Sequence, residues 1–183
     1  MKRWRSLSSK VIVQDAWLHL RADRCRLPSG KVLDPYYVVE EREWVHIFVH
    51  DEEGKVLVVR QYRYAADAEC VELPGGVVDK DESPIVAAQR ELAEETGYSA
   101  REWTEIASVF ANPARQTNRI HVFRAAGLTR AAPQRLDESE DISFEFATPT
   151  AIKQMIASGE FSQALHISSF FLGLEAHGAS GKR

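Results

Sequence analysis

The sequence predicts an α/β protein in which a mixed sheet lies between helices and follows a β-rich N-terminal region. Two observations carry this prediction. Segments of alternating apolar and polar residues lie on both sides of one well-marked helix, and two further helical segments come near the C-terminus. Strands around a central helix, followed by more helices, are typical of a sheet packed between helical layers.

The composition is that of an ordinary globular chain. Its 183 residues can bury a core, and 44% are hydrophobic and 27% charged. The net charge of −4 argues against a nucleic-acid partner, because such proteins carry a basic surplus. No segment reaches membrane-spanning length, and no apolar run follows the basic N-terminal residues as in a signal peptide. We therefore expect a soluble, cytoplasmic protein without nucleic-acid or membrane partners.

The two cysteines, Cys25 and Cys70, lie far apart in the sequence. A single bridge between them is one interpretation. Two buried free thiols in a reducing compartment are the favoured one.

The first part of the chain reads as β structure. Alternation predicts strands at Val11–Val13, Trp17–Arg21 and Tyr36–Glu40, with a turn at Pro28–Gly30. The segments Trp44–His50 and Lys55–Arg60 flank a turn that ends in glycine, which indicates a hairpin. We expect residues 1–42 to form an N-terminal β region, residues 43–177 the main domain, and residues 178–183 a flexible tail.

The clearest helix lies between Ser83 and Gly97. Ser83 suits an N-cap, Pro84 the first helical position, and Gly97 a left-handed residue after the last turn. Further along we expect a polar, irregular stretch at 130–141, and the remaining strands and helices at Trp103–Phe110, Arg119–Ala125, Ile142–Ala147, Thr150–Ser158 and Ser162–His177. Four aromatic residues of these strands are expected in the sheet core: Trp103, Phe110, Phe144 and Phe146.

One face of the central helix is acidic. Glu91, Glu94 and Glu95 stand at positions i, i+3 and i+4, where like charges repel by roughly 0.2–0.5 kcal/mol per pair. A cation would offset this repulsion, and an all-oxygen set without His or Cys favours magnesium or manganese. The alternative is a solvated acidic face with no ligand.

The spacing of residues around this helix is specific. Gly76 is followed by five residues, Glu82, seven residues, and then Arg90-Glu-Leu-Ala-Glu-Glu-Thr-Gly-Tyr98. This pattern resembles the Nudix box at every specified position. The resemblance implies a Nudix-type α/β/α sandwich that uses Mg²⁺, with Mn²⁺ as a substitute. By position it implies metal ligands at Glu91, Glu94, Glu95 and the Gly75 carbonyl, with Glu94 also able to position water, and with Glu82 and Arg90 orienting these carboxylates.

The resemblance also implies the reaction, which is attack of an activated water on one phosphorus of a diphosphate. A general base is expected outside the helix, in the acidic stretch 137–141. Nudix ADP-ribose hydrolases place a catalytic glutamate in a mobile loop at this point. Glu138 is the first choice and Glu140 the second, and a plain solvated loop is the alternative.

Two segments before the helix resemble those of ADP-ribose and sugar-nucleotide hydrolases, Val58–Arg63 and Glu72–Gly76. In those enzymes Arg63 would contact the diphosphate, which suits the forked geometry of arginine, and Glu72 would belong to the same site. Surface solubility is the alternative for Arg63.

A proline near position 113 accompanies the ADP-ribose subfamily, so Pro113 is a candidate substrate contact. The sequence here is Asn-Pro-Ala-Arg, whereas many relatives have Ser-Pro-Gly. Arg115 or Asn118 therefore offers an alternative, as part of a pocket for another sugar.

Aromatic residues of the N-terminal region are candidates for the nucleobase. Trp17 and Tyr36 flank the turn at Pro28–Gly30, and dimeric relatives stack aromatics of this region on the base. The alternative is that both belong to the strand core. Because this region contacts a second subunit in the family, we expect a homodimer. His166 and His177 are expected to be structural or exposed, since neither has a second His or Cys at ligand spacing.

The sequence thus predicts Mg²⁺-dependent hydrolysis of ADP-ribose or a related nucleoside diphosphate sugar. One alternative is a hydrolase of nucleoside triphosphates or dinucleoside polyphosphates. Another is a sensor that binds nucleotide sugars without turnover. The intact box carboxylates and the lack of a DNA-binding module in so short a chain argue against the sensor.

Overall fold

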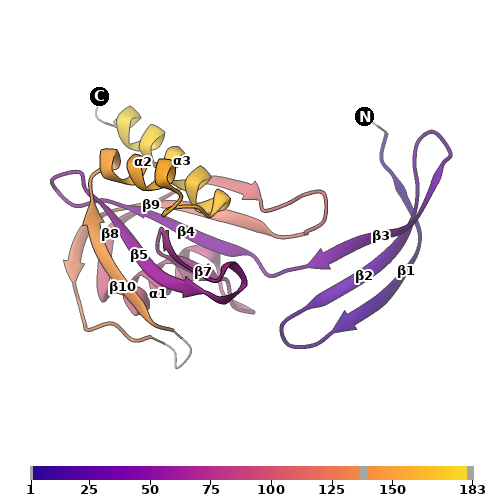
Figure 1. Cartoon of the computed structure of the whole chain (residues 1–183), viewed down its shortest axis with the longest axis horizontal. Coiled ribbons are helices and arrows are strands. Elements are labelled where there is room, and N and C mark those ends of the chain that lie inside the picture. The colour runs from indigo at the N-terminus through magenta and orange to yellow at the C-terminus, as the bar shows by residue number, and fades with distance from the viewer. Residues whose placement is uncertain (1, 137–139, 181–183) are drawn as a thin grey trace. The chain divides into compact units, whose positions relative to one another are not determined.

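The computed structural model describes residues 2–136 and 140–180 (Figure 1). The N-terminal sheet is antiparallel, with the strand order β1-β2-β3. Its strands are β1 (Arg5–Gln14), β2 (His19–Arg26) and β3 (Val32–Glu40). All three are longer than predicted. Trp17, which was expected in a strand, lies in the turn between β1 and β2, where Asp15 Oδ1 accepts hydrogen bonds from the N–H groups of Trp17 and Leu18 at 2.7 and 2.8 Å.

The chain divides into two compact units. One holds this sheet, up to Arg42, together with Phe110–Arg119, and the other holds the rest. The predicted domains were continuous stretches of the chain, with 110–119 in the main domain, whereas the first unit combines two separate segments. Segment 110–119 joins the first unit because it bonds to β3: Val39 N donates to the Arg115 carbonyl at 2.8 Å, and Thr117 N to the Val39 carbonyl at 3.2 Å.

The second unit contains two sheets. A mixed sheet has the order β7-β4-β9-β8, with β4 parallel to β9. Its strands are β4 (Trp44–Val49), β7 (Gly75–Val77), β8 (Tyr98–Phe110) and β9 (Arg119–Arg130). An antiparallel sheet has the order β10-β5-β6. Its strands are β5 (Val56–Arg63), β6 (Ala68–Glu72) and β10 (Ile142–Ala147), and a 3₁₀ turn, η1 (Tyr64–Ala66), joins β5 to β6.

The predicted hairpin between Trp44–His50 and Lys55–Arg60 is wrong. Only one bridge, His50 to Val56, links these segments in the described chain. The reason is that β4 pairs with β7 and β9 instead, so β5 is left to join β6 and β10. Alternation in the sequence identified the strands correctly but not their partners.

Three helices accompany these sheets: α1 (Pro84–Thr96), α2 (Pro149–Ser158) and α3 (Ala164–Ser180). Helix α1 begins after Ser83 and ends at Gly97, which has a left-handed φ of 72°, so both predicted ends are confirmed. The Ser83 side chain itself makes no capping hydrogen bond. Helix α3 extends past His177 to Ser180, so the first part of the predicted tail, residues 178–180, is helical, and residues 181–183 lie outside the described residues.

The core explains the layering. Strand β4 is buried on both faces, as a central strand between helical layers should be. Val45, Ile47 and Val49 belong to a cluster that includes Leu92 of α1. Phe48 points the other way, into a cluster with Ile152 of α2 and residues of α3. The α/β/α sandwich is therefore confirmed, with its central layer divided into two sheets.

Three of the four aromatic predictions hold. Trp103, Phe144 and Phe146 pack at the margin of the α1 cluster. Phe110 is 50% exposed and its ring lies 4.4 Å from the Arg119 guanidinium carbon, so it is not a core residue.

Both cysteines are free and buried, as expected. Within residues 2–136 and 140–180, no helix is long and apolar enough to cross a membrane.

Candidate active site

Two carboxylates of α1 lie against strand β7. The Gly75 N–H donates to Glu95 Oε2 at 2.9 Å. A Cβ at Gly76 would lie 2.3 Å from Glu91 Oε1, and one at Gly75 would lie 2.1 Å from the Val45 carbonyl oxygen. Because side chains cannot occupy such positions, this glycine pair lets β7 pass between β4 and the carboxylates of α1.

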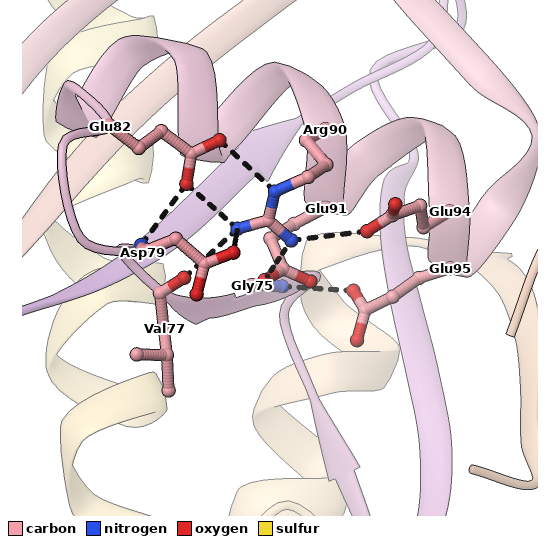
Figure 2. Close-up of polar contacts among 8 residues, drawn as sticks. All are labelled: Gly75, Val77, Asp79, Glu82, Arg90, Glu91, Glu94 and Glu95. Carbon is pink, nitrogen blue, oxygen red and sulfur yellow. Dashed lines mark hydrogen bonds and ion pairs between the residues drawn. The ribbon is translucent and has the colours of Figure 1, made fainter. Parts of the chain in front are cut away.

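Arg90 of α1 bonds to several acidic residues beside β7, and its Nη2 also donates to the Val77 carbonyl of β7 at 3.0 Å (Figure 2). Its Nε and Nη2 donate to Glu82 at 3.1 and 2.9 Å. Its Nη1 donates to Glu91 at 2.8 Å and to Glu94 at 3.1 Å. The bonds to Glu82, followed by those to Glu91 and Glu94, raise the pKa of Arg90 despite its partial burial. A single guanidinium thus fixes three glutamates that the sequence spacing had singled out.

Replacing Arg90 with Gln is expected to lower turnover by about 10–100-fold at saturating metal. Glu91 and Glu94 would lose the group that fixes their orientation, and loss of such orienting partners has effects of this size. Steady-state kinetics over a magnesium titration measure this. Arg101→Gln is the matched control, because the Arg101 side chain lies over Gly127. Equal turnover in the two variants would show that Arg90 does not orient the site.

Burial raises the pKa of two carboxylates beside β7. Glu95 is only 3% exposed, and burial raises its pKa well above the usual range. The Gly75 N–H and the charge of Arg63 lower the pKa, whereas the nearby charges of Glu91 and Glu140 raise it. Burial also raises the pKa of Glu91, against the effect of Arg90. A cation bound beside these two carboxylates would favour their ionised form.

A divalent cation fits this donor set. Glu91, Glu94, Glu95 and Glu140 offer only carboxylate oxygens, which are the ligands that hard cations prefer. In the part of the chain that the structure describes, no three Asp, Glu, His or Cys side chains converge on one point. In Figure 2, Glu91 and Glu94 each direct one carboxylate oxygen to Arg90.

The acidic stretch after β9 is tied to the end of α1 by Gln134. Its side-chain amide donates to the Glu95 carbonyl at 2.5 Å and to the Ile142 carbonyl at 3.1 Å. The Arg135 N–H donates to the Glu94 carbonyl at 2.9 Å. These bonds hold Gln134 and Arg135, which precede the acidic stretch, beside the end of α1, and they link Gln134 to Ile142, which follows it. The sequence did not reveal Gln134, because an amide in a polar irregular segment looks like a solvated loop residue.

Of the two candidate bases, the structure describes only Glu140. Glu138 lies outside the described residues. Glu140 is exposed, and its charge acts on both Glu91 and Glu95. Glu140 therefore lies near the α1 carboxylates.

Arg63 and Glu72 form a closely bonded pair. Arg63 Nε donates to Glu72 Oε1 at 3.1 Å, and Nη2 donates to Oε2 at 2.5 Å. The Arg63 side chain is 46% exposed, whereas that of Glu72 is 2% exposed. Glu72 was expected to contact substrate, but it lies beneath Arg63 with its carboxylate already bonded. Of this pair, only Arg63 is exposed enough to contact a bound molecule.

The other candidate substrate contacts belong to the first unit. Trp17 is 89% exposed, and Tyr36 is half-buried with its hydroxyl donating to the Ala114 carbonyl. This bond ties Tyr36 to the exposed segment that holds Pro113 and Arg115. Neither aromatic residue is in the core, so that alternative is wrong for both.

Asn118, the alternative pocket residue, is 2% exposed, and its amide has no hydrogen-bond partner among the described residues.

Comparison with known proteins agrees with this geometry. Residues 41–165 match the NUDIX domain, and residues 4–39 match the nucleoside diphosphate sugar hydrolase N-terminal domain. The chain therefore belongs to the Nudix hydrolase family. Within that family it is a pyrophosphatase, an enzyme that hydrolyses nucleoside diphosphate derivatives. Nudix hydrolases as a class use divalent metal ions.

Named relatives resemble the chain over most of its length. It is 30% identical over 161 residues to an ADP-ribose pyrophosphatase of Bacillus subtilis (strain 168), covering 87% of this chain and 86% of the relative. It is 28% identical over 167 residues to an ADP-ribose pyrophosphatase of Mycobacterium tuberculosis, covering 90% and 80%. A crystal structure of an ADP compounds hydrolase has the same fold, with a TM-score of 0.88, 19% identity, and coverage of 100% of this chain and 98% of that one.

Proposed function

We propose that the protein is a magnesium-dependent diphosphatase of ADP-ribose or a closely related nucleoside diphosphate sugar. Its products are a nucleoside monophosphate and a sugar phosphate. The observation that carries the proposal is the pair of buried carboxylates on α1, Glu91 and Glu95, which lie against the glycine pair of β7 and whose pKa values are raised by burial. Similarity to two ADP-ribose pyrophosphatases over most of their length supports the substrate class.

Each residue has a physical task in this reaction. Arg63, already oriented by Glu72, offers its guanidinium to the diphosphate oxygens. Glu91, Glu95 and the carbonyl of Gly75 would hold Mg²⁺ or Mn²⁺. A bound divalent cation supplies charge neutralisation for the diphosphate and makes a water more acidic. Glu94, 41% exposed, would complete the ligand set or position that water.

The acidic stretch would supply the general base. A carboxylate there takes the proton of the attacking water, from Glu138 as first choice or Glu140 as second. Support comes from Gln134 and Arg135, which precede the stretch and bond to the end of α1, and from the effect of the Glu140 charge on Glu95. Arg90, bonded to Glu82, would keep the ligand carboxylates in place.

Neutralising both candidate bases is expected to lower kcat by about 10²–10⁴, the usual contribution of a general base. The double variant Glu138→Gln, Glu140→Gln measures the loss, and the two single variants assign it. Asp141→Asn is the control from the same stretch, since Asp141 is exposed and is not assigned a role. If all four variants keep kcat within tenfold of the parent, the base does not come from this stretch.

A hydrolysis screen tests the function itself. ADP-ribose, GDP-mannose, UDP-glucose, a dinucleoside polyphosphate and a nucleoside triphosphate are each incubated with and without magnesium. The expected result is metal-dependent release of AMP and ribose phosphate from ADP-ribose. Preferred cleavage of the triphosphate or the dinucleoside polyphosphate would replace this proposal by the other hydrolase class. Tight, magnesium-independent binding without any turnover would identify a sensor. Labelled water, H₂¹⁸O, reports which phosphorus is attacked.

We also propose that the enzyme is a homodimer formed through its N-terminal β region. Support comes from β1, an edge strand on which Val11, Ile12 and Val13 are 49%, 45% and 37% exposed. Exposed apolar strand edges invite pairing with another chain. Light scattering should give twice the chain mass of 20.6 kDa, and a monomer at working concentration would reject the dimer. The two buried free thiols support a reducing compartment, which we take to be the cytoplasm.

A further inference from the structure

A cluster of polar side chains lies deep between the strands and α3, beneath Arg63. Its four buried members have exposed fractions of only 1–5%: His46, Glu72, His166 and Ser169. Such groups are costly to bury unless they are bonded to one another. None of the tasks in hydrolysis proposed above uses the two histidines or the serine.

The bonds of His166 define where its proton lies. The backbone N–H of Leu73 donates to His166 Nδ1 at 3.2 Å. A ring nitrogen that accepts a hydrogen bond carries no proton, so in the neutral ring the proton is on Nε2. Burial, with a smaller contribution from the charge of Arg63, lowers the pKa of His166 to about 3. At neutral pH the ring is therefore uncharged, and its protonated Nε2 atom lies 3.5 Å from Glu72 Oε2.

A second histidine fixes the plane of this ring. His46 of β4 stacks on His166 with ring centroids 3.8 Å apart and an interplanar angle of 16°. The Nδ1 of His46 lies 2.9 Å from the Ser169 hydroxyl, one turn beyond His166 on α3. Burial, together with the neighbouring His166, lowers the pKa of His46 well below its usual value. The His166 ring is thus held by Leu73 at its edge and by His46 on its face.

The Glu72 carboxylate connects the His166 ring to the Arg63 guanidinium. Oε2 accepts hydrogen bonds from Arg63 Nη2 at 2.5 Å and Gln61 Nε2 at 3.3 Å, and the His166 Nε2 atom lies 3.5 Å away from it. Oε1 accepts from Arg63 Nε. A carboxylate with donors on both oxygens cannot rotate freely, so the guanidinium bonded to it has a fixed plane. Pre-oriented donors of this kind strengthen phosphate binding because the side chain loses less conformational freedom on binding.

We propose that His166 is a positioning residue for the diphosphate: as a neutral Nε2–H donor it fixes Glu72, and Glu72 fixes Arg63 against the substrate. The inference rests on the proposed function, which assigns the diphosphate to Arg63. His46 and Ser169 act one step further away, by holding the His166 ring.

A double-mutant cycle between His166 and Arg63 tests this. His166→Leu removes the donor, and His166→Gln retains an amide that can replace it. With ADP-ribose as the substrate, His166→Leu is expected to raise KM about tenfold with a smaller change in kcat, and His166→Gln to recover most of the loss. In an Arg63→Ala background, His166→Leu should change kcat/KM by less than twofold, because no oriented guanidinium remains to be lost. Melting temperatures are measured for every variant.

Other outcomes separate the inference from the function on which it rests. Equal losses of kcat/KM from His166→Leu in both Arg63 backgrounds would show a purely structural role and overturn the inference alone. His46→Phe keeps the stacked ring and provides a core variant that should lower the melting temperature more than it changes KM. A ¹⁵N spectrum of the wild-type protein with the proton on His166 Nδ1 would also overturn the inference. No turnover of any diphosphate by the wild-type enzyme would overturn the proposed function and the inference together.

Discussion

Replacing Glu95 with Gln is expected to reduce kcat by about a thousandfold while the metal-free protein stays at least as stable as the parent. The activity falls because the side chain would lose the charge with which it holds the divalent cation, and the cation's contribution is several kcal/mol. Each 1.4 kcal/mol corresponds to a tenfold change in rate, so roughly 4 kcal/mol gives this factor.

The stability of the same variant is expected to change in the opposite sense. Glu95 is 3% exposed, and the charges of Glu91 and Glu140 oppose its ionisation. Glutamine has nearly the same shape, and its carbonyl oxygen can still accept the Gly75 N–H. Removing a buried charge while keeping its hydrogen bond should therefore leave the free energy of unfolding unchanged or higher.

Steady-state kinetics with magnesium and urea unfolding without it measure both effects of Glu95→Gln. Glu105→Gln is the matched control, because that side chain is 46% exposed and pairs with His121. The control should alter neither quantity appreciably. A variant at Glu95 that keeps kcat within tenfold of the parent would remove this residue from the catalytic machinery.

Arg63→Leu is expected to give the second large effect, a loss of roughly 3 kcal/mol in the free energy of unfolding together with a large rise in KM. The substitution leaves the Glu72 carboxylate buried without its cation, and breaking such pairs from one side typically costs about 3–5 kcal/mol. KM rises because the group that contacts the diphosphate is gone.

The reverse substitution, Glu72→Gln, should cost less stability. Arg63 is 46% exposed and can turn to water, and glutamine can still accept from it. Urea unfolding of the two variants under the same conditions shows which substitution lowers the free energy of unfolding more. A larger loss for Glu72→Gln than for Arg63→Leu would mean that Glu72 is not the buried partner that depends on the pair.

Local signals in the sequence predicted the parts of the site that local structure determines. Pro84 and Gly97 mark the ends of α1, and the spacing of Glu91, Glu94 and Glu95 follows from the helical repeat alone. Strands β4, β5 and β10 were likewise predicted to within about three residues at each end, whereas β6 and β7 were not predicted. These features depend on neighbours within one or two turns of the chain.

The remaining parts depend on pairing between distant segments. Glu72 was predicted to contact the substrate, but β6 pairs with β5 and places Glu72 beneath Arg63. His46 meets His166 only because β4 is a central strand with one face toward α3. The predicted hairpin between β4 and β5 failed for the same reason, since the pairing of β4 with β9 joins residues more than seventy positions apart. Alternation within a strand carries no information on which strand will be its neighbour.

A crystal structure with Mn²⁺ and a non-hydrolysable ADP-ribose analogue would test the metal site most directly. Anomalous scattering locates the manganese without reference to the protein density. The expected result is a peak bonded to the carboxylates of Glu91 and Glu95, with the analogue's diphosphate on the same ion and within reach of Arg63. A diphosphate bound elsewhere, or no peak beside α1 while Glu91 and Glu94 remain bonded to Arg90, would contradict it.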